Sequence, residues 1–274
     1  MARARGTRGE RPADAGSDGL TARARRTEIV RLLDDQEYVD VGELSRRFAM
    51  TEASVRRDLA LLESEGSITR VRGGAVARRG ARTSGFYAQA LHERVAEKRR
   101  IGEAAAALIE PRSIVFCDTG TTVARTIGAI PRGERSGVTI VTNSLAVVEE
   151  TSEWDNPHVV SLGGLYLPEY AAFVGPQTVG ALQHLRGDVA VLGCDGLTAE
   201  GGMTIAHQLI AEVGTTMAEH ARRIIAVTDS RKIGRLGFAP FLPISAVQTL
   251  ITDRDADRAE LEAIRARGVE VVVV

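Results

Sequence analysis

The sequence predicts an α/β protein in two parts, an N-terminal winged helix-turn-helix followed by a larger domain built on a parallel sheet. Two patterns lead to this prediction. Residues 21–77 carry three short amphipathic helices and a hairpin with a double-glycine turn. From residue 96 onward, apolar strands alternate with helices, which is typical of a mostly parallel sheet covered by helices.

Charge divides the chain in a similar way. Residues 1–100 hold 21 Arg and Lys against 15 Asp and Glu, whereas the remainder holds 14 against 21. A basic N-terminal third joined to an acidic remainder indicates that only the first part binds a polyanion. Only two of the 35 basic residues are lysines, Lys98 and Lys232.

Composition excludes several classes of protein. The chain of 274 residues is 44% apolar and 26% charged, as globular proteins are, and no apolar run approaches the ~18 residues of a membrane span. Residues 1–20 have no apolar stretch behind their arginines, so a disordered leader is expected there rather than a secretory signal. Cys117 and Cys194 are too few for a disulfide framework and lack metal-ligand spacing, which favours buried structural cysteines over a redox role. We therefore expect a cytoplasmic protein with no membrane partner, metal or cofactor.

Three helices are expected in the first part. The first has an apolar stripe over residues 29–33, and a short extended segment at residues 38–41 leads to the second. The second helix places Leu44 and Phe48 on one face, and Thr51 is suited to cap the third. The chain up to residue 66 is therefore expected to be largely helical.

The third helix has the pattern of a recognition helix. Apolar residues at i, i+4 and i+7 give it one buried face, and the opposite face is small or basic. Such a face can enter the major groove, with arginines reaching phosphates or guanine edges. The apolar residues are Val55, Leu59 and Leu62, and the candidate DNA contacts are Ser54, Arg56 and Arg57.

A basic hairpin follows the third helix. Residues 68–71 alternate as a strand does, Gly73-Gly74 is suited to a turn, and residues 66–82 hold five arginines and no acidic residue. Arg70 and Arg72 are therefore candidates for contacts with the DNA backbone. A solvated, charged helix in a small three-helix subdomain would give similar spacing, so the pattern alone leaves both interpretations open.

Residues 51–76 closely resemble the DNA-binding module of DeoR-type bacterial transcriptional regulators. The matching residues are Thr51, Ser54 to Leu59, Leu62-Glu63, Gly66 and Arg70 to Ala75, and the departures are Ser54 for threonine, Val55 for isoleucine and Arg72 for histidine. The resemblance implies that Ser54, Arg56 and Arg57 read or clamp a double-stranded DNA operator. Arg70 and Arg72 would hold its backbone. Asp58 lies toward the core side of the helix and is expected to pair with an arginine.

The larger domain is expected over residues 96–274, after a linker at residues 78–95. Its strands are expected at residues 113–117, 138–141, 158–162, 188–192, 223–227, 247–251 and 269–274, with helices at residues 121–127, 145–151, 208–221 and 255–267 among them. Ligands of such folds bind beyond the carboxyl ends of the strands.

Polar groups recur at those strand ends. Gly120, Thr121 and Thr122 open a helix, where free N–H groups and the helix dipole favour a phosphate. Helix caps and turns would explain any one of these loops equally well, but the same polar character recurs at five strand ends. The candidate ligand-binding residues are Asp118, Gly120, Thr121, Thr122, Asn143, Ser144, Gly163, Gly164, Asp195 and Lys232.

This second part resembles the effector domain of DeoR-type regulators, so the resemblance extends over about residues 25–274. The matching motifs are Glu97-Lys98, Ile101-Gly102, Asp118 to Thr122, Thr142 to Ser144, Gly163-Gly164, Val174-Gly175, Asp195-Gly196 and Asp229 to Lys232. It implies a Rossmann-like sheet related to sugar-phosphate isomerases that senses phosphorylated sugars. Asp118 would bind sugar hydroxyls, Gly120 to Thr122 phosphate, and Lys232 would supply charge. Residues 208–214 depart from the family's Glu-rich, Lys-containing helix, so the ligand contacts of that helix are in doubt.

Three functions follow from these patterns. The leading hypothesis is a transcriptional regulator, a repressor of a carbohydrate-metabolism operon that works as a homo-oligomer and responds to a phosphorylated sugar. The alternative is a sugar-phosphate isomerase or deaminase with a DNA-binding appendage, in which Asp118, Asp195 and Lys232 serve as acid, base and anion stabiliser. The third is a DNA-binding scaffold that senses nothing.

Overall fold

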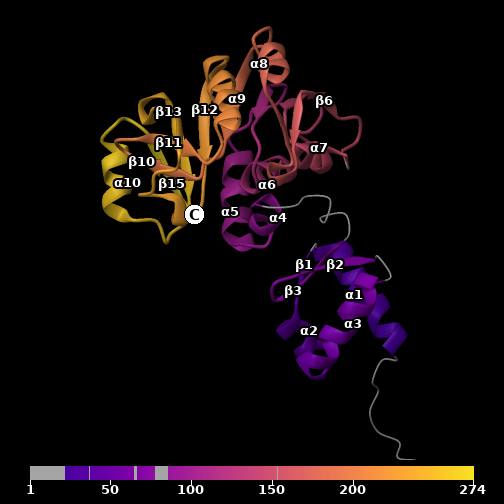
Figure 1. Ribbon diagram of the computed structural model, residues 1–274. Helices are drawn as coiled ribbons and strands as arrows, with labels where there is room; N and C mark the ends of the chain where they lie inside the picture. The colour runs from indigo at the N-terminus through magenta and orange to yellow at the C-terminus, as the bar shows by residue number, and fades with distance from the viewer. Residues whose placement is uncertain (1–21, 37, 65–66, 78–85, 153) are drawn as a thin grey trace, which may run out of the picture. The chain divides into compact units, whose positions relative to one another are not determined.

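The computed structural model describes residues 22–36, 38–64, 67–77, 86–152 and 154–274, and the predicted leader at residues 1–20 lies outside them. The chain divides into two compact units, residues 1–82 and 83–274 (Figure 1). Among the described residues, no helix has both the length and the apolar character needed to cross a membrane.

The first unit has the three helices and the hairpin that the sequence predicts. Its sheet has the antiparallel order β1-β3-β2. The short extended segment before the second helix therefore adds a strand to the basic hairpin, and these three strands form the wing. Ile29, Leu44, Val55 and Leu59 lie fully buried in its core. The elements are α1 (Ala22–Gln36), β1 (Tyr38–Asp40), α2 (Val41–Arg47), α3 (Glu52–Ser64), β2 (Ile68–Val71) and β3 (Gly74–Ala77).

The hairpin turn lies one residue earlier than the sequence predicts. It consists of Arg72 and Gly73, because Gly74 already pairs with Val71 and Asp40 as the first residue of β3. Gly73 has φ +89°. At Gly74 a Cβ would lie 2.1 Å from the carbonyl oxygen of Val39, so only glycine allows β1 and β3 to pair this closely.

The second unit is built on a seven-stranded parallel sheet of order β15-β14-β12-β9-β4-β5-β6. All seven strands coincide with predicted segments to within about two residues. They are β4 (Ile114–Cys117), β5 (Thr139–Thr142), β6 (His158–Ser161), β9 (Gly187–Leu192), β12 (Ala221–Val227), β14 (Thr249–Thr252) and β15 (Glu270–Val273).

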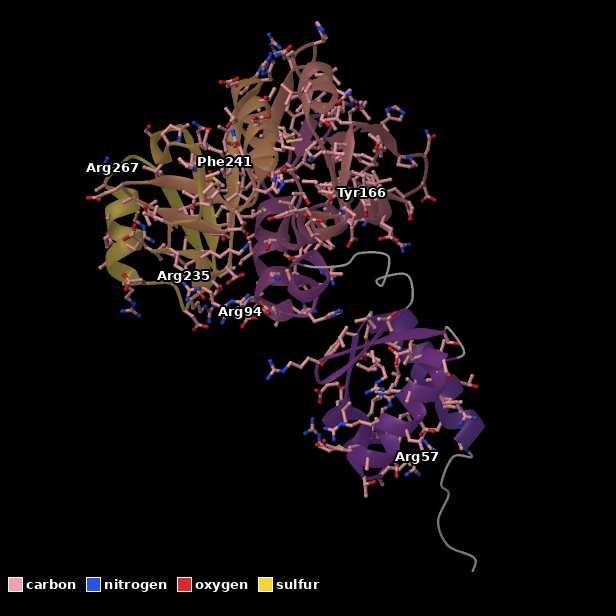
Figure 2. The ribbon with its side chains drawn as sticks, viewed as in Figure 1. Arg57, Arg94, Tyr166, Arg235, Phe241 and Arg267 are labelled. Carbon is pink, nitrogen blue, oxygen red and sulfur yellow. The ribbon has the colours of Figure 1, made fainter. Side chains whose placement is uncertain are left out.

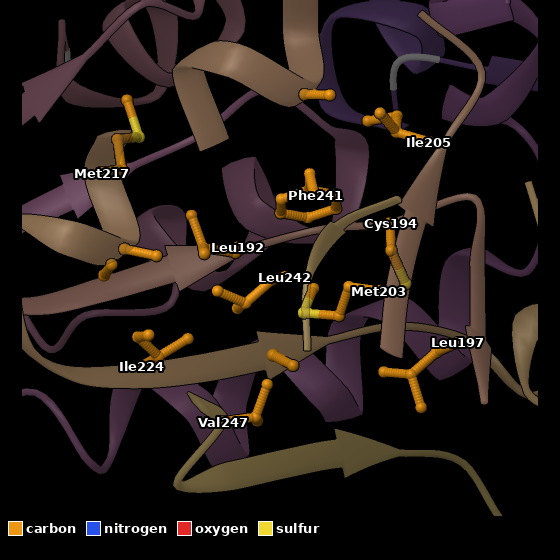
Figure 3. Packing of buried hydrophobic residues seen from close by; sticks show 14 of the residues in the cluster. Leu192, Cys194, Leu197, Met203, Ile205, Met217, Ile224, Phe241, Leu242 and Val247 are labelled. Atoms are coloured by element: carbon orange, nitrogen blue, oxygen red, sulfur yellow. The ribbon is translucent and has the colours of Figure 1, made fainter. Parts of the chain in front are cut away.

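Helices cover both faces of this sheet. Side chains alternate between the two faces of a strand, so Val189 and Val191 of β9 enter one core and Ala190 and Leu192 enter the other. The first core receives α5 (Val95–Ala106), α6 (Thr121–Gly128) and α7 (Leu145–Thr151). The second receives α8 (Pro176–Leu182), α9 (Gln208–Glu219) and α10 (Arg258–Arg265). Figure 3 shows part of the second core, including Leu192, Met217 and Phe241.

Two smaller sheets and two helices were not expected from the sequence, and one of these helices is α8. The sheets are the hairpin β7 (Leu165–Leu167) with β8 (Ala172–Val174), and β10 (Gly196–Thr198), β11 (Gly202–Ile205) and β13 (Ala239–Leu242) in the order β10-β11-β13. The helix α4 (Phe86–Leu91) lies within the predicted linker at residues 78–95. It forms part of the second unit because Tyr87 is buried in the core beside the sheet.

Candidate functional site

The recognition helix α3 presents its predicted contacts to solvent. Ser54 lies at its start, where its backbone N–H is 3.3 Å from Oγ1 of Thr51, so Thr51 caps the helix as predicted. Arg56 is exposed and forms an i, i+4 ion pair of 2.6 Å with Glu52. Arg57 extends from the outer side of α3 (Figure 2) and has no acidic partner among the described residues.

The inner side of α3 is fixed by a buried ion pair. Asp58 accepts a hydrogen bond of 2.7 Å from Nε of Arg25, and Nη1 of Arg26 lies 3.7 Å away. This confirms the expectation that Asp58 pairs with an arginine. Asp58 and Arg57 are consecutive residues of α3, about 100° apart around the helix axis, so anchoring the buried Asp58 also fixes the direction of the exposed Arg57.

The wing carries the other two predicted DNA contacts. Arg70 on β2 is exposed, its backbone N–H donates to Glu63 at 3.1 Å, and its guanidinium lies 3.8 Å from the same carboxylate. Arg72 is exposed in the hairpin turn, and the described residues give it no acidic partner. Arg72 and Arg57 are thus uncommitted cations on the surface of one small unit.

In the second unit, Asp118 is the most unusual of the predicted ligand-binding residues. It ends β4 and is completely buried, and neither carboxylate oxygen has a hydrogen-bond partner of good geometry among the described residues. Burial raises the pKa of Asp118 to about 7, opposed by the Thr119 amide and reinforced by the charge of Asp195. An unpartnered buried carboxylate costs free energy, which a ligand that donates hydrogen bonds would offset.

Helix α9 packs over Asp118, and the residue of α9 that faces this carboxylate is Gly214. A Cβ built on Gly214 would lie 3.7 Å from Oδ2 of Asp118 and 3.0 Å from the ring of Phe241. Gly214 belongs to the segment in which the sequence departs from the family pattern. The departure therefore lies directly against the predicted sugar-binding carboxylate.

The next three predicted residues form the start of α6. Gly120 has φ +133° and is the N-cap, and no side chain caps the helix there. Thr121 and Thr122 are buried in the first turn, and Thr119 just before them donates from Oγ1 to the carbonyl of Tyr170 at 2.8 Å. The helix start thus retains the uncapped N–H groups that a phosphate would need.

Asn143 and Ser144 follow β5, and their roles differ. Nδ2 of Asn143 donates to the carbonyl of Phe173 at 2.9 Å, whereas its buried Oδ1 has no partner among the described residues. Oγ of Ser144 accepts from the Val147 amide at 3.4 Å and so caps α7. A capping role is sufficient to explain Ser144, while Asn143 leaves one acceptor uncommitted.

Gly163 and Gly164 connect β6 to β7. The Gly163 carbonyl accepts a hydrogen bond of 2.8 Å from Oγ1 of Thr178. Gly164 has φ +154°, and a Cβ there would lie 2.5 Å from the carbonyl oxygen of Val174. Packing of the β7–β8 hairpin is therefore sufficient to explain both glycines.

Asp195 and Lys232 lie together at the ends of β9 and β12. Nζ of Lys232 donates to the carbonyl of Cys194 at 2.6 Å and lies 3.7 Å from Oδ1 of Asp195, whose Oδ2 accepts from the Ala206 amide. Both side chains are partly exposed. They are the solvent-accessible members of the predicted set that carry charge.

Sequence reasoning did not place Lys98 among the site residues. Lys98 is 3% exposed and donates to the carbonyl of Ala90. Burial, followed by the charge of Lys232, lowers its pKa to about 8. The sequence signal that could have singled out Lys98 was the scarcity of lysine, because the chain has only Lys98 and Lys232. In the fold the charges of these two lysines interact.

An ionic network joins the start of α5 to the segments that follow β12 and β14. Arg231 lies 2.7 Å from Glu93 and 3.0 Å from the buried carboxylate of Asp229. Arg94 lies 2.8 Å from the buried Asp253, which follows β14. Apart from Arg231–Asp229, which are two positions apart, no local sequence pattern signals these pairs, because Arg231–Glu93 and Arg94–Asp253 each join residues more than 130 positions apart.

Tyr170 and His207 also border this region. Their rings meet edge to face with centroids 5.7 Å apart, and Nδ1 of His207 accepts from the Leu209 amide as the cap of α9. Burial and then the charge of Asp195 raise the pKa of Tyr170. An aromatic side chain thus lies close to the accessible carboxylate of Asp195.

Comparison with known proteins supports a two-part assignment. Residues 25–79 match the DeoR-like helix-turn-helix domain, and residues 93–254 match the DeoR C terminal sensor domain. The HTH-type transcriptional regulator GlpR of Haloferax volcanii is 32% identical over 90% of this chain and 96% of that protein. The HTH-type transcriptional repressor GlcR of Bacillus subtilis is 29% identical over 89% and 93%. The L-fucose operon activator of Haemophilus influenzae is 27% identical over 82% and 90%.

A solved structure shows a weaker similarity. Ribose 5-phosphate isomerase A from Methanocaldococcus jannaschii aligns with a TM-score of 0.36 at 16% identity, over 49% of this chain and 52% of that chain. A similarity of this extent indicates neither a ligand nor an activity.

A helix-turn-helix unit with uncommitted arginines, joined to a sensor domain, defines a DNA-binding transcriptional regulator. The chain belongs to the DeoR family of these regulators.

Proposed function

We propose that this chain is a repressor of a carbohydrate-metabolism operon, and that a phosphorylated sugar or related metabolite releases it from its operator. One observation carries the proposal. Asp118 is a buried carboxylate without a hydrogen-bond partner of good geometry among the described residues, and it lies two residues before the uncapped start of α6. A sugar phosphate would supply hydroxyl donors to the first and an anion to the second.

Each candidate residue then has a role. Asp118 and Oδ1 of Asn143 accept hydrogen bonds from sugar hydroxyls, and Gly120 to Thr122 bind phosphate. Asp195 and Lys232 lie on the solvent-accessible side of the site. A ligand that binds there would replace the ion pair of 3.7 Å between them with its own contacts to both residues. Ser144, Gly163 and Gly164 shape the pocket through their local packing and contribute less binding free energy.

On the DNA side, Arg57 contacts base edges beside Ser54 and Arg56, and Arg70 and Arg72 contact phosphates. The uncommitted guanidiniums of Arg57 and Arg72 support this division, since neither must leave an acidic partner to reach DNA. Arg56 and Arg70 would first exchange Glu52 and Glu63 for phosphate. Helix-turn-helix proteins commonly bind paired half-sites, so we include a homo-oligomer in the proposal.

A specific observation keeps an enzyme as the second candidate. A carboxyl group with a pKa near 7 is suited to general acid–base catalysis, and Asp118 is such a group. We favour binding alone because Asp118 is completely buried and Lys232 is already engaged by Cys194 and Asp195. Incubating the purified protein with sugar phosphates and following product formation by NMR separates the two. Turnover that Asp118→Asn abolishes would establish the enzyme.

The test of the proposed function begins with DNA selected by the full-length protein from a random pool. Binding to the selected DNA and to random DNA is then measured by fluorescence anisotropy across a panel of sugar phosphates. We expect the selected DNA to bind at least ~10³-fold more tightly than random DNA, and one class of sugar phosphate to release it. Equal binding to both DNAs would reject sequence-specific regulation. Selective binding that no sugar phosphate alters would reject the sensor.

A further inference from the structure

Four charged side chains next to Lys232 form a closed ring, which we call the charged ring. Arg231 lies 2.7 Å from Glu93, and the residue after Glu93, Arg94, lies 2.8 Å from Asp253. Asp253 uses its second oxygen to accept a hydrogen bond of 2.8 Å from the backbone N–H of Ser230, the neighbour of Arg231. The ring thus joins three segments, which are the corner of residues 92–94 between α4 and α5, the single turn η3 (Ser230–Lys232) and the residue that follows β14.

The charged ring holds this corner in a strained conformation. Arg94, labelled in Figure 2, has φ +53°, a left-handed backbone that residues with a Cβ disfavour. Its guanidinium is held by Asp253, which is buried, and by Asp255 at 2.7 Å. A residue held in such a conformation relaxes when its contacts are lost. The corner is therefore suited to switch between two arrangements.

The corner also fixes α4, the first described element of the second unit. The amine of Lys98, in the first turn of α5, donates to the carbonyl of Ala90 near the end of α4. Tyr87 of α4 is buried in the core, and α4 also packs on α6. In the sequence, only residues 78–85 separate α4 from the last strand of the wing. A change at the corner thus reaches the part of the chain that leads to the helix-turn-helix unit.

The turn η3 connects the charged ring to the candidate ligand site. Its last residue, Lys232, donates to the carbonyl of Cys194 at 2.6 Å and lies 3.7 Å from Asp195. Arg231 is the preceding residue of the same turn, and it holds the buried carboxylate of Asp229 at 3.0 Å. An anion that draws Lys232 away from Cys194 and Asp195 would therefore also displace Arg231.

We propose that the charged ring transmits ligand binding from Lys232 to α4, and that opening of the Arg231–Glu93 pair releases the operator. This inference rests on the proposed function, in which a sugar phosphate replaces the contacts of Lys232 and lowers the affinity for the operator. The closed ring, with Lys232 on Cys194 and Asp195, is then the arrangement that binds DNA. Arg231 and Glu93 act as positioning residues, because they control α4 without contacting the sugar phosphate or the DNA.

The first experiment follows backbone hydrogen exchange of the full-length protein by mass spectrometry. Glu93→Gln and Arg231→Gln each remove one charge of the ring, and each should speed exchange at residues 86–94 by about fivefold or more. The double variant should add little to either, because each change already opens the same pair. Exchange in β4 and β9 should stay at the wild-type rate, whereas a general loss of stability would speed it there too.

Glu262→Gln is the matched control for this experiment. It breaks an ion pair of 2.6 Å with Arg265 on α10, outside the charged ring, by the same chemical change. Exchange at residues 86–94 should then remain at the wild-type rate.

The second experiment tests the link to Lys232 with inorganic phosphate, an anion of the proposed kind without a sugar. Phosphate is expected to speed exchange at residues 86–94 of the wild type, compared with potassium chloride at the same ionic strength. It should add nothing in Arg231→Gln, in which the pair is already open. Wild-type exchange that phosphate leaves unchanged would contradict the link.

The third experiment measures binding to operator DNA, selected as above, without any sugar phosphate. Glu93→Gln makes the protein less negative and Arg231→Gln makes it less positive, so direct electrostatics would change the two DNA affinities in opposite directions. Opening of the ring gives both changes the same sign, and each variant should bind the operator about tenfold more weakly. Circular dichroism verifies that the variants are folded.

The proposal is overturned if neither variant changes exchange at residues 86–94, or if the two operator affinities stay unchanged or shift in opposite directions. The exchange measurements involve no DNA, so they judge the ring even if the wild type selects no operator, a result that would refute the proposed function. A wild type that selects an operator and responds to a sugar phosphate, with variants that behave as it does, would refute the ring and leave the regulatory function standing.

Discussion

Nη2 of Arg94 lies 2.8 Å from Oδ1 of Asp253, so the residue that precedes α5 is tied to the carboxyl end of β14. Asp253 is 1% exposed and also accepts from the Ser230 amide. Arg94 adopts a left-handed backbone with φ +53°. The fold thus maintains a strained residue where α5 begins, and the ion pair offsets that strain.

We expect Arg94→Ala to lower the free energy of unfolding of the second unit by about 2–4 kcal/mol, because it leaves Asp253 buried without its cation. Arg94→Gly should recover about 1 kcal/mol of this loss, since glycine adopts the left-handed backbone without a Cβ penalty. Urea unfolding followed by fluorescence of Trp154, the single tryptophan of the chain, reports on this unit. Arg99→Ala, which breaks an exposed pair with Glu103, is the control and should change stability by less than ~0.5 kcal/mol.

We expect Asp118→Asn to stabilise the protein at pH 8 and to weaken sugar-phosphate binding. Folding raises the pKa of Asp118 from about 4 to about 7, so the folded state takes up a proton between these values. The stability of the wild type therefore falls as pH rises from about 4 to 7, and asparagine removes that loss. The difference should be about 2–4 kcal/mol at pH 8 and shrink toward zero near pH 4. A difference that does not vary with pH in thermal or urea unfolding would contradict a buried, ionisable Asp118.

Two arginines of the first unit should affect DNA binding differently. Arg72→Ala is expected to weaken binding to operator and random DNA alike, and to flatten the log–log salt dependence by about one unit. Arg57→Ala should reduce the discrimination between the two DNAs by ~1–3 kcal/mol, because a lost guanine contact is specific to sequence. Anisotropy titrations at several salt concentrations measure both quantities. Equal losses on both DNAs for Arg57→Ala would remove Arg57 from base recognition.

Thr122→Asp should produce a regulator that its effector no longer releases. A carboxylate in the first turn of α6 repels a phosphate there, while it remains compatible with the helix dipole. Thr122→Ser, which retains the hydroxyl group, is the matched control and should respond to the effector as the wild type does. Operator binding is measured with and without the sugar phosphate that releases the wild type, and circular dichroism monitors folding. If the folded aspartate variant were still released at the wild-type concentration, the phosphate would have to bind elsewhere.

The sequence predicted those parts of the fold that local periodicity encodes. The seven strands of the parallel sheet are continuous apolar runs bounded by polar or glycine-rich loops, and buried parallel strands have this appearance. The capping of α3 by Thr51 and the pairing of Asp58 with an arginine were equally accessible, because helical spacing places Asp58 on the inner face. The helix α4 was missed because glycine, arginine and serine around it resemble a linker, whereas Tyr87 contributes its burial only once the sheet exists.

Only part of the site could be predicted. The strand-end rule located Asp118, Asn143, Asp195 and Lys232, whose positions depend on the sheet alone. It could not distinguish these residues from Ser144, Gly163 and Gly164, for which a helix cap and the hairpin β7–β8 are sufficient explanations. The pairs Arg94–Asp253 and Arg231–Glu93 depend on contacts between distant segments, which no short motif encodes.

Lys98 has a practical consequence for chemical labelling. Because the chain contains only two lysines, an amine-reactive reagent can modify only Lys98, Lys232 and the N-terminal amine. Lys232 is about one-third exposed, whereas Lys98 is buried with its amine on the Ala90 carbonyl. The burial that lowers the pKa of Lys98 to about 8 also shields its amine, so a reagent reaches Lys98 only when it is uncovered. The ratio of the two labels, read by mass spectrometry of tryptic peptides, would therefore count how often α5 separates from the strand ends in the unmodified protein.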